Sequence, residues 1–198
     1  MINLNDDAFN GGSNVSIFNN GTAGIVENVK ISLKRKTAED KDNAPDYKLI
    51  YDDGIGEVNT AFWYVKEATD YATVDEQIQK QGKILKHLVH AVYGSEFEFP
   101  NFPNPTAMLD GVMKLLKEGV GQNTYRVFTN YGSTMGVKQY IQVRSWVPFI
   151  EPMSVSIENT RLKRGNIDAM ERLTEDSADP EFSDNGTSKS LANDGDDW

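Results

Sequence analysis

The segment AGIVENVKISLKRK, residues 23–36, alternates between apolar and polar side chains with a period of two. One face holds Ile25, Val29, Ile31 and Leu33, and the other holds Asn28, Lys30, Ser32, Lys34 and Lys36. Successive side chains of a β-strand point to opposite sides of the sheet. The segment therefore predicts a half-buried strand whose polar face is rich in lysine.

Strand patterns continue on the C-terminal side of this segment. A charged break that contains proline, TAEDKDNAPD, is followed by DYKLIYD at 46–52 and by VNTAFWYV at 58–65. Between these two runs, residues 53–56 (DGIG) have the composition of a turn. We therefore expect three consecutive strands in the N-terminal third of the chain.

The period then changes to that of a helix. Apolar residues recur at helical spacing over 75–93 and again over 106–118, and Gly94 stands where the first of these helices should end. Alternation returns over 124–131 and 138–147, which flank a glycine-bounded loop. The chain is therefore expected to form three strands, a helical insert and two strands.

This order predicts a mainly β fold, a five-stranded OB-fold barrel with its helices between the third and fourth strands. We assign residues 1–173 to this single domain. Residues 174–198 differ in composition, because eight acids and one base give them −7 of the net charge of −10. Such a segment has too little apolar surface to offset its ordering entropy, so we expect a disordered acidic tail.

Several kinds of chemistry have no residues to support them. The chain has no cysteine, and its two histidines, His87 and His90, lack the further ligands of a metal site; we interpret them as solvated residues of a helix face. No phosphate-binding glycine loop or nucleophile elbow occurs. We therefore expect no enzyme, cofactor or metal, and the enzymatic alternative is a Mg²⁺-dependent nuclease using Asp52, Asp53 or Glu57.

Targeting signals are also missing from the sequence. No run approaches the roughly 20 apolar residues that span a bilayer. The polar N-terminus lacks the basic and apolar regions of a signal peptide. We therefore expect a cytoplasmic protein that does not bind membranes.

Basic and aromatic residues on the predicted strands form the candidate site. Aromatic rings stack on unpaired bases, and cations meet phosphates. On the last strand we expect Ile141, Val143 and Val147 in the core, and Tyr140, Gln142, Arg144 and Trp146 outside. Periodicity leaves open whether Trp63, or Phe62 with Tyr64, faces inward. The candidate nucleic-acid-binding residues are Lys30, Lys34, Lys36, Trp63, Arg126, Phe128, Tyr140, Arg144 and Trp146.

The run GTAGIVENVKISLKRK…APDYKLIY…FWYV, the basic and aromatic strand face and the acidic tail together resemble phage-type single-stranded-DNA-binding proteins. The resemblance covers roughly residues 20–150 and the tail. It implies a protein that coats exposed strands during DNA replication, recombination and repair, in the host cytoplasm. It also implies a tail that recruits polymerase, helicase–primase or repair enzymes and competes with DNA for the binding groove.

The end of the tail is the most specific part of this resemblance. The expected partner-binding residues are Asp194, Asp196, Asp197 and Trp198, an aromatic anchor with flanking carboxylates. Tails of this family more often end in phenylalanine, so Trp198 is a departure that bears on the identity of the partner.

A second reading assigns the acidic balance to a different function. The chain would then be a non-enzymatic interaction protein, a DNA mimic or a virion component that binds a host protein. It would share the acidic tail but lack a basic groove. The sequence leaves open the preference for DNA or RNA, the binding-site size and whether the chain forms a homo-oligomer.

Overall fold

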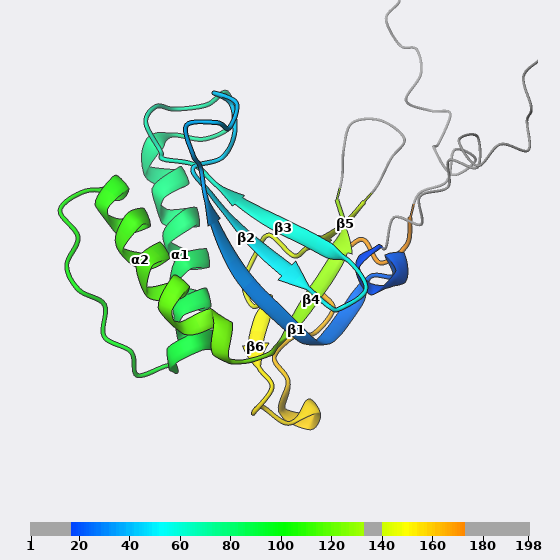
Figure 1. Cartoon of the computed structure of the whole chain (residues 1–198). Helices are drawn as coiled ribbons and strands as arrows, with labels where there is room; N and C mark the ends of the chain where they lie inside the picture. The colour runs from blue at the N-terminus through cyan, green and yellow to red at the C-terminus, as the bar shows by residue number, and fades with distance from the viewer. Residues whose placement is uncertain (1–16, 133–139, 173–198) are drawn as a thin grey trace, which may run out of the picture.

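The computed structural model describes residues 17–132 and 140–172, and Figure 1 shows their arrangement. The predicted tail, 174–198, lies outside these residues. The strands are β1 (Gly24–Arg35), β2 (Tyr47–Asp52), β3 (Glu57–Phe62), β4 (Tyr125–Tyr131), β5 (Ile141–Val143) and β6 (Ile150–Pro152). The helices are α1 (Val74–Tyr93) and α2 (Pro105–Gly119), and short 3-10 turns occur at Phe18–Gly21, Val120–Gln122 and Ile157–Asn159.

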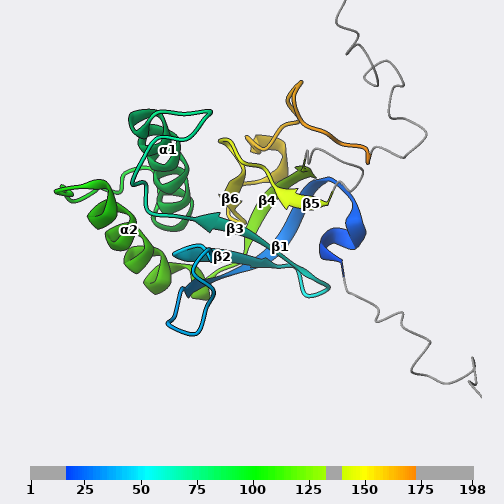
Figure 2. The same cartoon turned by 90° about the horizontal axis from the view of Figure 1, so that it is seen from above.

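Five of the strands form a nearly closed antiparallel barrel. Their hydrogen-bonded order is β3-β2-β1-β4-β5, and β3 contacts β5 where the two ends of this order meet. The short β6 pairs with β4 beside β5. Both helices stand on one side of the barrel (Figure 2). The prediction of a mainly β barrel with a helical insert is confirmed at this level.

A bulge in β1 changes which residues face the core. The pairing of β1 with β4 shifts register between Val26 and Val29, where Asn28 has a φ of 59°. Because the extra residue reverses the alternation, Val26 is buried and Ile25 is 37% exposed. The predicted assignment of Ile25 to the core face is wrong, whereas Val29, Ile31 and Leu33 pack in or against the core as expected.

Both helices begin at the caps that local sequence supplies. Thr73 and Glu76 form a capping box at the start of α1, and the Asn104 side chain accepts from the Ala107 amide at the start of α2. Each helix buries one apolar face, and the two pack against each other. The buried helix residues are Leu85, Leu88, Val89, Ala91, Leu109, Val112, Met113 and Leu116.

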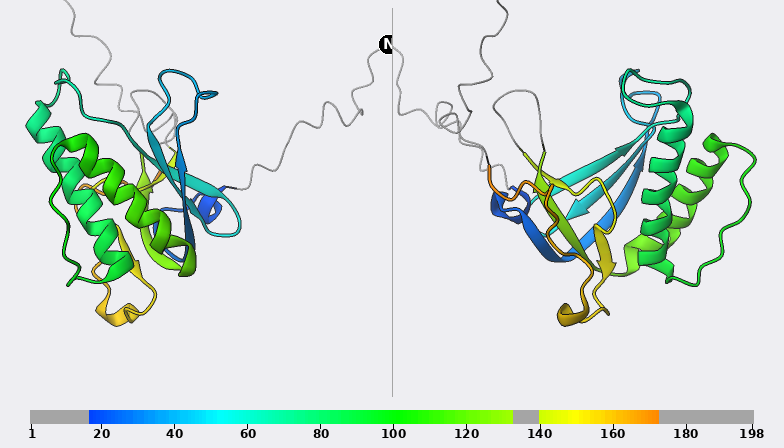
Figure 3. Two further views of the ribbon diagram at one scale, coloured as in Figure 1. Left: turned by 60° about the vertical axis from the view of Figure 1, so that its left-hand side comes forward. Right: turned by 180° about the vertical axis from the view of Figure 1, so that it is seen from behind.

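The last predicted strand is shorter in the structure than expected. The last predicted strand, 138–147, is regular only over Ile141–Val143, and the chain bends after it. Ile141 and Val143 are buried as expected, but Val147 is 41% exposed because the alternation has already ended. Beyond β6, residues 153–172 form a segment that we call the C-terminal strap. Figure 3 shows it, gold to orange, passing along β4 and β5.

Candidate nucleic-acid interface

The structure separates the predicted binding residues into two groups. Lys30, Lys34 and Trp63 are exposed on the β1–β2–β3 side, with Lys36 half-buried beside them. Tyr140 is exposed and Trp146 is half-buried near β5. In contrast, three predicted residues on β4 and after β5 are buried: Arg126, Phe128 and Arg144.

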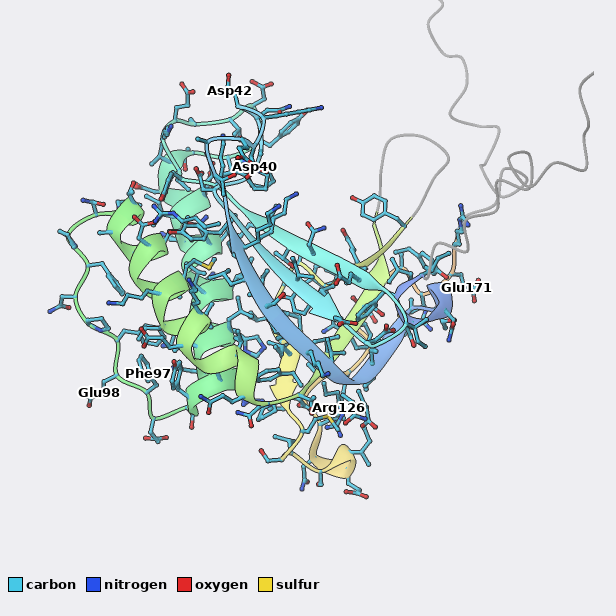
Figure 4. The ribbon with its side chains drawn as sticks, in the orientation of Figure 1. Asp40, Asp42, Phe97, Glu98, Arg126 and Glu171 are labelled. Carbon is cyan, nitrogen blue, oxygen red and sulfur yellow. The ribbon has the colours of Figure 1, made fainter. Side chains whose placement is uncertain are left out.

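Arg126 is buried between a buried carboxylate, Glu151, and an exposed one, Glu27. Its guanidinium lies 2.7 Å from the Glu27 carboxylate and 2.6 Å from that of Glu151, and it donates to the Val155 carbonyl at 3.0 Å. In Figure 4 it lies at the opposite end of the molecule from Asp40 and Asp42. With its donors occupied and its side chain buried, Arg126 is not available to a phosphate.

Arg144 is occupied in the same way by the strap. Its guanidinium donates to both carboxylate oxygens of Asp168 at 3.1 and 2.7 Å and to the carbonyls of Pro148 and Lys163. It also stacks over the Phe128 ring at 3.7 Å. Burial lowers the pKa of Arg144, which the Asp168 carboxylate opposes. The expectation that Arg144 points outward is wrong, because the strap covers this face of the sheet.

The structure shows which side chains at the end of β3 face inward, a point that periodicity left open. Phe62 is buried in the barrel, while the next residue, Trp63, is 52% exposed. Gln81 on α1 donates to the Trp63 carbonyl at 3.0 Å, which fixes the backbone beneath the indole. The indole borders a hollow of about 220 Å³ whose other wall, on α1, includes Gln77 and Lys80.

Several cations gather at the same end of the sheet. The strand register places Lys34 opposite Lys48, and Lys48 opposite Ala61, two positions before Trp63. A shallow hollow beside them is lined by Lys34, Arg35, Lys36 and Lys48, which we call the basic corner. The carboxylate of Asp40 lines the same hollow, and the Lys36 ammonium donates to the Asp42 carbonyl at 2.6 Å, so the basic corner has four cations against one acid. Sequence analysis missed Arg35 and Lys48.

The other end of this face is acidic. Lys30 pairs in register with Asp52, which pairs with Glu57. Burial opposes ionisation of Asp53, but backbone amides of Gly56, Asn19 and Ile55 outweigh it and lower its pKa. Asp52 and Asp53, which accept hydrogen bonds from the amides of Gly54, Ile55 and Gly56, therefore stabilise the β2–β3 turn. In residues 17–132 and 140–172, no three histidine or acidic side chains are grouped as metal ligands.

The tail residues Asp194, Asp196, Asp197 and Trp198 lie outside the described residues, so their predicted role has no structural description.

Neither family models, nor curated proteins, nor solved structures gave a match to this chain. Within the part of the chain that the structure describes, no helix combines the length and apolar character that crossing a membrane requires.

Proposed function

We propose that the protein binds single-stranded DNA on an OB-type barrel and coats exposed strands during replication, recombination and repair. The observation that carries this proposal is the exposed indole of Trp63 at the same end of the sheet as the four cations of the basic corner. The nearly closed barrel is compatible with such a fold. No catalytic step is part of the proposal.

The two kinds of side chain supply complementary parts of the binding energy. An exposed ring can stack on an unpaired base, worth about 1–3 kcal/mol per base and with little sequence preference. The neighbouring cations neutralise phosphates and make affinity depend on salt. In a duplex the bases are already stacked on one another, so Trp63 favours the single strand. Exposed Tyr140, directly before β5, offers a second ring.

Tryptophan fluorescence tests the proposal. In a variant that keeps Trp63 and carries Trp146→Phe and Trp198→Phe, oligothymidylate should quench the emission and duplex DNA should not. Trp63→Leu in the full chain should weaken binding by about 5- to 150-fold, the equivalent of one stacked base. Trp146→Leu is the matched control, since this indole is half-buried beside Arg144.

The outcomes separate the two readings of the sequence. Quenching by the single strand together with a selective loss in Trp63→Leu supports the proposal. No mobility shift of oligothymidylate by the wild-type chain would overturn it and would favour an acidic interaction protein that binds a host protein. Parallel titration with oligouridylate measures the preference for DNA or RNA.

A further inference from the structure

A third hollow lies where the barrel meets α2. It has a volume of about 360 Å³ and is lined by Leu33, Arg35, Tyr47, Asp110, Met113, Lys114 and Lys117. Lys114 and Lys117 are exposed and three residues apart, so they share one face of α2. We call this hollow the α2 cleft.

The α2 cleft has an excess of positive charge that its own acid does not offset. Three cations, Arg35, Lys114 and Lys117, line it with one carboxylate, Asp110. The hydroxyls of Tyr47 and Tyr64 both donate to the same oxygen of Asp110 at 2.6 Å. These hydrogen bonds, that from Tyr47 foremost, lower the pKa of Asp110. Asp110 therefore stays ionised and engaged with the tyrosines, and the cations retain capacity for an external anion.

Arg35 joins the α2 cleft to the basic corner. It lines both hollows, and its guanidinium carbon lies 5.5 Å from the centre of the Tyr47 ring. From this position at the end of β1, Arg35 connects the sheet lysines to the lysines of α2. The two hollows together hold six cations, which we call the track and of which Arg35 alone lines both: Lys34, Arg35, Lys36, Lys48, Lys114 and Lys117.

We propose that the α2 cleft holds the sugar–phosphate backbone of the same single strand that stacks on Trp63, with Lys114 and Lys117 each meeting a phosphate. This inference rests on the proposed function and extends it from the sheet to the helical insert. The half-buried side chain of Leu33 in the cleft suits a sugar and carries no base-specific donors. The contact is therefore insensitive to sequence.

The salt dependence of binding tests this proposal. Each phosphate contact with a single strand adds about 0.7 to the slope of log affinity against log salt. The double variant Lys114→Gln and Lys117→Gln should therefore make the fall of log affinity with log salt less steep, by about 1.4. Its affinity for oligothymidylate should fall most at low salt and approach the wild-type value as salt rises, with Trp63 quenching retained.

The control is Lys83→Gln with Lys86→Gln, which removes two exposed lysines at the same spacing from α1. An unchanged slope in the control and a reduced slope in the α2 variant supports the proposal. If the wild-type chain binds oligothymidylate and the α2 variant keeps the full slope, the α2 cleft is not part of the track, although the proposed function stands. If the wild-type chain does not bind the single strand, the proposed function itself fails.

A second titration distinguishes a backbone phosphate from a free nucleotide. Thymidine monophosphate, tested without DNA, should show no saturable binding that depends on Lys114 and Lys117. Binding that is lost in the α2 variant would make the α2 cleft a nucleotide pocket and would overturn the proposal.

Discussion

The imidazole of His87 joins α1 to the segment around β6, a contact that helical periodicity does not predict. Its Nε2 accepts hydrogen bonds from the backbone amides of Phe149 and Ile150 at 3.2 and 3.4 Å, and its ring packs against the Phe149 ring. The interpretation of His87 as a solvated residue is therefore wrong. Burial, aided by the positive charge of Arg161, lowers its pKa to about 4, while the Glu151 charge opposes the shift.

This shift predicts a loss of stability in mild acid. The unfolded chain takes up a proton at His87 below a pKa of about 6.5, but the folded chain does so only near 4. As the pH is lowered from about 6.5 to about 4, the free energy of unfolding should therefore decrease, by at most about 1.4 kcal/mol per pH unit. Urea unfolding at a series of pH values measures this slope, which His87→Gln should reduce. An equal slope in His87→Gln would contradict the assignment.

The C-terminal strap determines which sheet face is open to solvent. Asp168 binds Arg144 and the Gly165 amide, and the Ala169 carbonyl accepts from the Tyr131 amide at the end of β4. Thr160 donates to Glu151 in the Arg126 cluster. The strap therefore covers the face of β4 and β5, whereas Lys30, Lys34 and Trp63 on β1 and at the end of β3 are exposed among the described residues.

Breaking the Arg144–Asp168 pair should lower the free energy of unfolding without removing a contact to DNA. Arg144→Met leaves a buried carboxylate without its partner, which costs about 3–5 kcal/mol. Lys163→Met, an exposed strap position, should change stability by less than about 0.5 kcal/mol. Urea midpoints measure both. If Arg144→Met kept its stability and lost affinity for the single strand, Arg144 would be a DNA contact after all.

Charge is distributed very unevenly over the whole chain. Of the 30 acids and 20 bases, residues 174–198 hold eight acids and one base, which leaves 22 acids and 19 bases in residues 1–173. Against this nearly balanced remainder, the six cations of the track stand together. A covalently attached acidic segment acts at high effective concentration, so we propose that it competes with DNA for the track.

Deleting residues 174–198 should accordingly tighten binding to oligothymidylate. The gain should be largest at low salt, where charges are least screened, and should shrink as ionic strength rises. A chain in which the eight acids of 174–198 are replaced by their amides is the matched control and should behave like the deletion. Equal affinities of the full-length and shortened chains at low salt would rule out competition by the tail.

The order of strands and helices could be predicted because periodicity and capping are local properties of the chain. The alternation at 30–35, the helical spacing of α1 and α2 and the end of α1 at Gly94 each depend on neighbours a few residues away. The negative charge of 174–198 is likewise a property of composition. Among the described residues, the three N-terminal strands and the two helices occur close to their predicted ranges, whereas the strand predicted over 138–147 is regular only over Ile141–Val143.

The position of each basic residue was decided by contacts between segments far apart in sequence. Arg126 meets Glu27 and Arg144 meets Asp168 only when the barrel closes and the strap crosses it, so no alternation pattern could show that they are buried. For the same reason, folding brings Arg35 together with Lys114 and Lys117. Burial of a charge depends on a partner supplied by the tertiary fold, because an unpaired charge in the interior is too costly.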